Sequence, residues 1–369
     1  MDAGLSGVCA YPQHVQKRSR GEKEGAGDFD MGDELFKGLA APQGMRLDVG
    51  ERGVYVLTLE EPVGHGRMRG VAASPDFIAA TVDFWCESCP NMVVASTREA
   101  GWFSRGTWFT VNYCLEGRCE VFVPHRGFAV VKASDCCISG SHTLPDEFRY
   151  PLGRYRGVEL FVNTDIVRRD AAFSLLAGEP RSVEGMVGAP GFAAVFSGDR
   201  RLNGIMERIG EAMGSLDTVR MRYELLGLLL ELLRRDMGDA RPRGLLTKSQ
   251  MSIAHAARDE VERSLGQSHD ARLIAARLGV SAATLNRYFA DVYGCTVAAY
   301  VRRRRMEEAS ALLTSGVSVA DASLSVGYAN PSKFAAAFKR AMGVSPSSYR
   351  RAIALDAAAH TASGEAERL

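Results

Sequence analysis

Residues 281–300 read SAATLNRYFADVYGCTVAAY, and residues 330–349 read NPSKFAAAFKRAMGVSPSSY. The opening residues, Ser281 and Asn330, are both types that cap the N-terminus of a helix. Four landmarks return after 49 residues, as the pairs Leu285 and Phe334, Phe289 and Phe338, Gly294 and Gly343, and Tyr300 and Tyr349. A repeat at a fixed spacing predicts that one short helical unit occurs twice.

A second, shorter helix is predicted before each of these helices. Asp270 can cap a helix that Gly279 ends, and Ser318 opens a matching helix that ends at Gly327. Pro331 then occupies the first position of the following helix, where a proline is tolerated. A helix, a tight turn containing glycine and a second helix form the helix-turn-helix pattern, whose second member normally enters the major groove of DNA.

Residues 296–314 are predicted to form one helix that joins the two units, and here the chain resembles the AraC/XylS family of bacterial regulators. The linker residues that carry the resemblance are Tyr300, Arg305, Ala309, Leu312 and Leu313. The residues of the second unit are Val319-Ala-Asp-Ala, Val326-Gly-Tyr, Phe334, Phe338-Lys, Gly343, Ser345-Pro346 and Tyr349-Arg350. The resemblance spans about 100 residues and implies two recognition helices in successive major grooves on one face of the duplex.

The helical spacing predicts which side chains contact bases. With Leu285 and Phe289 buried, the first recognition helix presents Ala283, Thr284, Asn286 and Arg287. Arg287 suits a guanine edge and Asn286 an adenine edge. A shift of 49 residues gives Ser332, Lys333, Ala335 and Ala336 on the second helix, of which we take Ser332, Lys333 and Ala336 as base-reading candidates. We therefore expect the first unit to carry most of the sequence specificity and the second mainly to add affinity.

Other basic residues of the module are better placed for phosphates, which makes DNA binding strongly salt-dependent. Arg305 is instead predicted to be a structural ion-pair residue, with Asp321 as a partner. The phosphate candidates are Arg302, Arg303, Lys339, Arg340 and Arg350.

The chain of 369 residues exceeds what one hydrophobic core supports, so an α+β multidomain protein is expected. Between Lys248 and Arg351 there are 15 Lys and Arg against 8 Asp and Glu; because the whole chain carries +1, the remainder carries −6. A basic module is thus joined to an acidic one. The predicted segments are a disordered lead (1–33), a β-rich effector domain (34–165), a helical association segment (166–238), a linker (239–248), an all-α DNA-binding domain with two helix-turn-helix units (249–352) and a disordered tail (353–369).

Short runs of β-branched and aromatic residues predict antiparallel strands in the effector domain, arranged as a small barrel or sandwich that can enclose a ligand. Glu116 and Gly117 are predicted to form a hairpin turn. Residues 109–120, 150–160 and 223–233 resemble, more loosely, the effector half of family members of the pyochelin-receptor-regulator type, which implies a small-molecule or iron-chelate ligand. The runs are 54–59, 77–84, 108–115, 119–123, 128–131 and 155–162, and the candidate pocket residues are Trp85, Trp102, Trp108, Tyr113 and Arg118.

The association segment contains an unusually apolar helix. Its apolar residues recur at helical spacing and cover most of its circumference, so the helix must be buried, either under the β-rich domain or against a second subunit in a homodimer. The residues at helical spacing are Val219, Tyr223, Leu226, Leu230 and Leu233.

The cysteines suggest an alternative function, a regulator that senses metal or thiol redox state. Cys86 and Cys89 have the spacing of half a zinc site, and Cys136 with Cys137 could complete it. Cys114 and Cys119 would face each other across the predicted hairpin, as a redox switch requires. Burial of ordinary free thiols is the competing interpretation.

Other classes of function are disfavoured. The most apolar run, 225–233, is too short to span a bilayer and contains Glu231. No positioned nucleophile and base, phosphate-binding glycine loop or cofactor motif stands out, so neither an enzyme nor a cofactor is expected. The sequence predicts a cytoplasmic transcription regulator whose partners are double-stranded DNA, a small effector and, if it is an activator, RNA polymerase.

Overall fold

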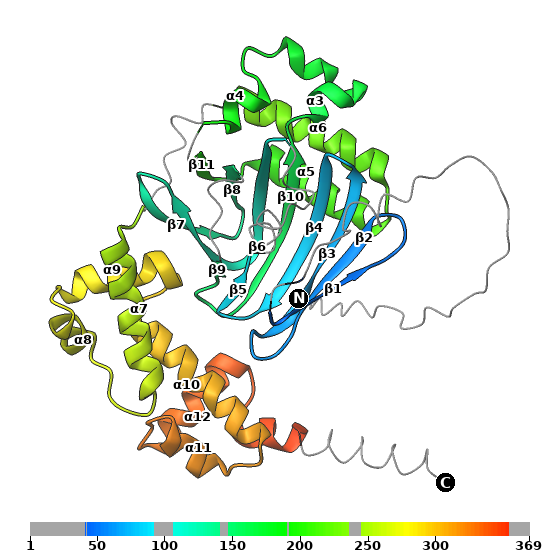
Figure 1. Cartoon of the computed structure of the whole chain (residues 1–369). Coiled ribbons are helices and arrows are strands. Elements are labelled where there is room, and N and C mark those ends of the chain that lie inside the picture. Colours follow the sequence, from blue (N-terminus) through cyan, green and yellow to red (C-terminus); the bar gives the residue numbers. More distant parts are fainter. Residues whose placement is uncertain are drawn as a thin grey trace, which may run out of the picture.

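A computed structural model of the chain describes residues 41, 43–91, 106–140, 147–189, 192–235 and 245–353. Figure 1 shows a β-rich domain with helices on one face, followed by a helical C-terminal domain. Among the described residues, no helix is both long and apolar enough to cross a membrane.

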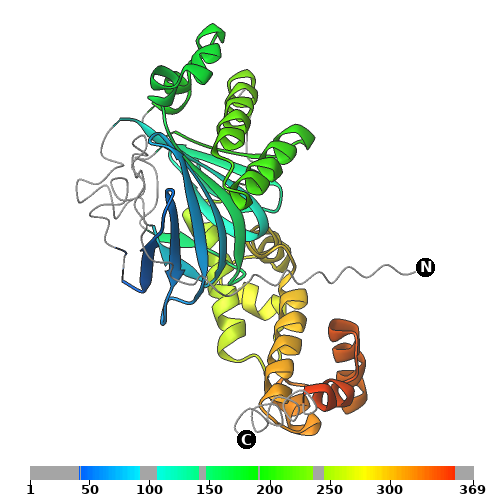
Figure 2. The ribbon, with the colours of Figure 1, turned by 90° about the vertical axis from the view of Figure 1, so that its right-hand side faces the viewer.

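The β-rich domain is built on one curved sheet, which Figure 2 shows nearly edge-on. Its main path runs β1-β2-β3-β4-β10-β6-β8-β11, with β7 and β9 paired to β6 and β5 paired to β9. All of these pairings are antiparallel. The strands are β1 (Met45–Val49), β2 (Val54–Leu59), β3 (His65–Ser74), β4 (Phe77–Trp85), β5 (Ser88–Pro90), β6 (Trp108–Val123), β7 (Gly127–Lys132), β8 (Asp135–Gly140), β9 (Glu147–Arg149), β10 (Tyr155–Asn163) and β11 (Ala193–Ser197).

Alternate residues of the central strands feed two separate cores because successive side chains of a strand point to opposite faces. On β10, Val158 and Leu160 belong to the core under the helices, whereas Phe161 belongs to the core on the other face. Glu159 is buried on that second face and accepts a hydrogen bond of 3.0 Å from the amide of Asn112. The predicted β-rich domain is therefore confirmed, with the form of a half-barrel.

Helices cover one face of the sheet (Figures 1 and 2). They are α3 (Ile166–Arg169), the 3-10 helix η3 (Ala171–Gly178), α4 (Val183–Val187), α5 (Arg200–Gly214) and α6 (Thr218–Arg234). The segment predicted to be helical also supplies β11, which pairs with β8. Residues 166–235 are thus built into the β-rich domain rather than attached to it.

The apolar helix α6 buries one face against the sheet and leaves another open. Leu225, Leu228 and Leu229 are fully buried in the core, whereas Val219 and Tyr223 are 73% and 72% exposed. Helix α6 can therefore pack under the β-rich domain with one face and still contact a second subunit with the other, so the two predicted alternatives do not exclude each other.

The hairpin predicted at Glu116–Gly117 is wrong, because residues 108–123 form one continuous strand. Leu115 is an extra residue in the pairing with β10, since Glu116 pairs with Arg156 and Cys114 with Gly157. Gly117 has φ +89°, and a Cβ there would lie 2.2 Å from the carbonyl oxygen of Arg154. The positive φ of Gly117 therefore belongs to a β-bulge and not to a hairpin turn.

The C-terminal domain contains two cores that share one helix. Val297, Tyr300 and Val301 of α10 belong to the core of α7, α8 and α9, whereas Met306 and Leu313 belong to the core of α11 and α12. The two cores are joined rigidly because α10 is continuous through both of them. The helices are α7 (Lys248–Arg263), α8 (Ala271–Arg277), α9 (Ala282–Tyr293), α10 (Val297–Thr314), α11 (Val319–Ser325) and α12 (Pro331–Met342), and residues 346–353 are also helical.

Candidate nucleic-acid interface

The helix pair α8–α9 is defined by its caps. Asp270 caps α8 by accepting the N–H of Arg272 at 2.8 Å, and Ser281 caps α9 by accepting the N–H of Thr284 at 3.1 Å. Gly294 ends α9 at φ +77°, a left-handed conformation that favours glycine. The predicted bounds of this pair are confirmed.

The pair α11–α12 repeats this geometry. Ser318 accepts the N–H of Asp321 at 3.1 Å, Asn330 accepts the N–H of Lys333 at 3.0 Å, and Gly343 ends α12 at φ +79°. Both α9 and α12 contain 12 residues, and their bounds differ by 49 positions at each end. The repeat in the sequence is therefore a repeat in the structure.

The candidate base-reading side chains lie at the surface or partly exposed. On α9, Ala283 and Arg287 are exposed, and Thr284 and Asn286 are half-buried. On α12, Ser332, Lys333 and Ala336 are exposed and Ala335 is half-buried. That these residues contact DNA remains a prediction.

Asn286 has a role that the sequence did not suggest. Its Oδ1 accepts a hydrogen bond of 3.1 Å from the backbone N–H of Val297, at the start of α10. Two-point recognition of adenine needs both the oxygen and the nitrogen of the amide. The bond to α10 holds the amide oxygen of Asn286 toward the protein, and Asn286 is half-buried whereas Arg287 is exposed, so Arg287 is the stronger candidate.

The phosphate candidates separate into two groups. Arg302, Lys339, Arg340 and Arg350 are exposed and form no ion pair with another described residue. Arg303 instead lies 3.5 Å from Glu307 and lines a cleft between the domains. Arg302 is therefore better placed than Arg303 for a phosphate.

Arg272 is a candidate that sequence reasoning missed. It is exposed on α8, the first helix of its pair, and forms no ion pair with another described residue. In a helix-turn-helix unit the first helix crosses the DNA backbone. The signal in the sequence was a basic residue two positions after the capping Asp270.

Arg305 is structural, but the predicted ion pair with Asp321 is wrong. Its guanidinium donates to the carbonyl oxygens of Leu265 and Gln267 at 3.0 and 2.6 Å, while Asp321 is bonded to Ser318. Arg305 therefore ties α10 to the turn before α8 through backbone acceptors.

The four candidate pocket residues that the structure describes do not line one cavity. Trp108 is buried in the core on the open face of the sheet, and Tyr113 in the core under the helices. Trp85 is 42% exposed at the end of β4, and Arg118 donates to the carbonyl oxygen of Asp291 at 2.9 Å. Trp102 lies outside the described residues.

The cysteines do not form the sites proposed for them. Cys136 and Cys137 face opposite sides of the sheet, and no group of three or more metal-ligating side chains occurs in the described part of the chain. Cys114 and Cys119 lie on one continuous strand rather than on facing strands of a hairpin, and both thiols are free. These two cysteines were expected to face each other because a hairpin was predicted between them, and residues 108–123 form no hairpin.

One thiol pair does form. Cys86 and Cys89 hydrogen-bond to each other; this bond lowers the pKa of Cys86, and together with burial it raises that of Cys89. All seven cysteines in the described residues are free.

The β-rich domain contacts the first helix pair through an interface that sequence reasoning missed. The buried carboxylate of Glu120 lies 3.0 Å from Nε2 of His255 on α7, and Nδ1 of His255 lies 2.9 Å from the hydroxyl of Tyr293 on α9. Backbone hydrogen bonds of 2.7 and 2.8 Å join Phe128 of β7 to Leu246. No sequence signal pairs residues this far apart in the chain.

Arg118 completes this interface at the C-terminal end of α9. Besides its bond to Asp291, its guanidinium lies so close to Gly294 that a Cβ there would be 2.6 Å from Nη2. Burial lowers the pKa of Arg118 from its ordinary value. Arg118 on β6 therefore contacts the C-terminal end of α9.

Known proteins share this C-terminal geometry. Residues 274–352 match the family model described as a helix-turn-helix domain. The probable transcription factor PqrA of Proteus vulgaris is 36% identical over 78 residues, which cover 21% of this chain and 64% of that protein. The transcriptional activator AarP of Providencia stuartii is 33% identical over 105 residues, 28% of this chain and 78% of that protein. The chain belongs to the AraC family of transcription regulators.

The family match in this AraC-family chain begins within α8 and extends beyond α12, so it includes α9 and α12 in full. A solved structure with partial likeness is the C-terminal domain of AraT, a response regulator from Geobacillus stearothermophilus. It is 33% identical and covers 27% of this chain and 84% of its own, with a TM-score of 0.26. The β-rich domain lies outside the family match.

Proposed function

We propose that this protein is a sequence-specific, DNA-binding transcription regulator that inserts α9 and α12 into adjacent major grooves. The observation that carries the proposal is the equivalence of the two helices, each of 12 residues and each ended by a left-handed glycine, on a shared α10. A helix-turn-helix protein that reads two sites needs such a rigid spacing, because successive major grooves are about one helical turn apart.

The proposal assigns different tasks to the two pairs. Arg287 on α9 reads a guanine, and α12, which presents Ser332, Lys333 and Ala336, mainly adds affinity. The exposed cations Arg272, Arg302, Lys339, Arg340 and Arg350 bind phosphates.

The β-rich domain is proposed to sense a small effector and to transmit its presence through β6 to α9. Support comes from Arg118 and Glu120, which lie on the same strand as the buried Asn112 and contact the first helix pair. The exposed Val219 and Tyr223 of α6 favour association of two copies, and the named activator function of AarP favours activation through RNA polymerase. Such a protein would act in the cytoplasm, where the chromosome lies.

Selection of binding sites from random DNA by the full chain tests this proposal. We expect a motif with two parts whose centres are about 10 base pairs apart, the stronger part being the one that Arg287 contacts. Affinity should fall steeply with salt, as expected for several phosphate contacts. Enrichment of no motif, or of a motif with a single part, would contradict the two-groove mode.

A further inference from the structure

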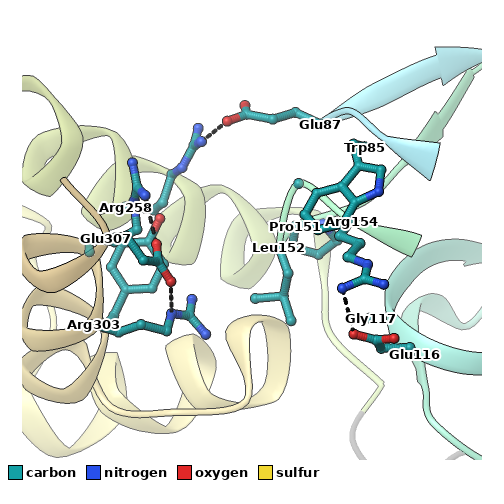
Figure 3. Close-up of a pocket in the computed structure, with 13 residues that line it drawn as sticks. Trp85, Glu87, Glu116, Gly117, Pro151, Leu152, Arg154, Arg258, Arg303 and Glu307 are labelled. Carbon is teal, nitrogen blue, oxygen red and sulfur yellow. Dashed lines mark hydrogen bonds and ion pairs between the residues drawn. The ribbon is translucent and has the colours of Figure 1, made fainter. Parts of the chain in front are cut away.

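A cleft of about 470 Å³ lies between the β-rich domain and the C-terminal domain (Figure 3). Trp85, Leu152 and Arg154 form the wall of the cleft on the β-rich domain, and Arg258 of α7 lies on the opposite wall. Tyr300 of α10 also lines the cleft. A cleft of this size matches the sites that proteins use for small organic ligands, which combine apolar walls with a few fixed polar groups.

Guanidinium groups outnumber carboxylates in this cleft. Glu116 lies 3.0 Å from Arg154, and Glu307 lies 2.7 Å from Arg304. Two carboxylates behind the lining also pair with these cations, Asp259 at 3.2 Å from Arg258 and Glu262 at 2.8 Å from Arg304. The Nε atoms of Arg154 and Arg258 are shielded from solvent and have no hydrogen-bond partner in the described residues. The carboxylates of the cleft therefore do not satisfy all of its donors. The cations are Arg154, Arg258, Arg303 and Arg304, and the anions are Glu87, Glu116 and Glu307.

The pair Glu87–Arg258 crosses the cleft and joins the two walls, as Figure 3 shows. The two partners are unequal, because the side chain of Glu87 is 65% exposed and that of Arg258 is 22% exposed. An exposed carboxylate gains little from such a pair and is readily replaced. A ligand carboxylate can therefore compete with Glu87 for Arg258.

We propose that the interdomain cleft binds a small organic carboxylate with an apolar body, whose carboxylate takes the place of Glu87 on Arg258. The planar guanidinium accommodates a carboxylate in two-point geometry. The apolar body of the ligand contacts Trp85, Pro151 and Leu152. The inference names the effector class of the regulator, and in that respect it rests on the function proposed above.

The proposal also gives the effector a route to the DNA-binding helices. Occupation of the cleft releases Glu87 and removes one contact that holds α7 to the β-rich domain. Helix α7 belongs to the same core as α9, so a change in this contact reaches the first recognition helix. A ligand shifts this equilibrium only by its difference in affinity for the joined and released states.

Calorimetric titration of the full chain with phthalate, in the absence of DNA, tests the site. Glu87→Gln removes the competing carboxylate and should tighten phthalate binding up to about fivefold, the worth of an exposed ion pair. Arg258→Lys loses the planar fork and should weaken binding about tenfold. Glu147→Gln is the matched control, because Glu147 forms a similar exposed pair with Arg149 at 2.7 Å but does not line the cleft.

Opposite effects of Glu87→Gln and Arg258→Lys, with Glu147→Gln unchanged, would support the site. Equal tightening by Glu87→Gln and Glu147→Gln would show a general charge effect and overturn it. Absence of binding of phthalate, benzoate and succinate to both wild type and Glu87→Gln would overturn it as well. A gel-shift assay of the same protein keeps the two ideas apart, because DNA binding without carboxylate binding rejects the cleft site alone.

Discussion

The two helix pairs of the C-terminal domain have capping residues at equivalent positions and helices of equal length, but they differ in what surrounds them. The first pair is held by Arg118, Glu120 and Phe128 of the β-rich domain. In the described residues, no hydrogen bond or ion pair joins α11 or α12 to that domain. The comparison teaches that a duplicated fold has one copy that contacts the β-rich domain directly and one copy that is attached through α10.

The largest expected effect tests whether the two cores of the C-terminal domain unfold independently. Phe338→Ala removes a fully buried ring that contacts Phe334 and Tyr349, so it should destabilise the second pair by about 3–5 kcal/mol. Hydrogen exchange should then rise in α12 while α9, supported by the β-rich domain, keeps its protection. Ser332→Ala, at an exposed position of the same helix, is the control. Equal loss of protection in α9 and α12 would show that the two pairs unfold as one unit.

A pH effect is expected to reach the first pair more than the second. Burial raises the pKa of Glu159 to about 7, above its ordinary value of 4.5. The folded protein therefore retains a proton that the unfolded chain loses, and stability falls as pH rises from about 4.5 to 7, by up to ~3 kcal/mol. Because Glu159 is bonded to Asn112 of β6, exchange in α9 should follow this loss more than exchange in α12.

Glu159→Gln tests this origin of the pH dependence. Glutamine can still accept the hydrogen bond of Asn112 but carries no charge, so the variant should be more stable at pH 8 by roughly 1–3 kcal/mol and nearly unchanged at pH 4.5. Urea unfolding at both pH values measures the difference. A variant that loses stability at pH 8 would mean that the ionised carboxylate has a favourable partner in the native state.

The chemistry of the recognition helices predicts an asymmetry in DNA reading. Arg287→Ala should cost about 1–3 kcal/mol at one base pair and relax the preference there. Lys333→Ala should weaken binding nearly uniformly across sequences and reduce the salt slope by about 1. Site selection with each variant, at two salt concentrations, makes the comparison. A sharper loss of preference from Lys333→Ala than from Arg287→Ala would reverse the roles of the two pairs.

The smallest expected effect is at the interface between the β-rich domain and α9. Arg118→Ala removes one hydrogen bond to Asp291, worth about 1 kcal/mol, and should raise hydrogen exchange at the C-terminal end of α9. Arg126→Ala, in the exposed turn between β6 and β7, should change nothing. If exchange in α9 is the same in both variants, Arg118 does not restrain the helix.

Local signals predicted the helix pairs well. The caps Ser281 and Asn330 and the glycines at 294 and 343 act within a few residues of the helix ends that they define, so sequence spacing was sufficient. The same reasoning failed at Gly117, because a positive φ serves a bulge as well as a turn and the choice depends on the distant partner strand β10.

The sensory half was harder to predict because its contacts are made between distant segments. The stripe of Val219 and Tyr223 has helical spacing, yet it lies on the exposed face of α6, since Leu225 and Leu228 form the buried face. Trp108 and Tyr113, chosen as parts of one pocket, belong to the two separate cores of the sheet. The Glu120–His255 contact links positions 135 apart in the chain, for which one sequence carries no signal.

The continuity of α10 through both cores has a consequence for how such a protein can evolve. One residue inserted in this helix would turn the second unit by about 100° and move it by about 1.5 Å relative to the first. Its contact surface would then point away from the duplex. In the two-groove mode proposed above, the length of this one helix sets the separation of the two parts of the DNA site, and the insertion of a single residue does not give a new working separation.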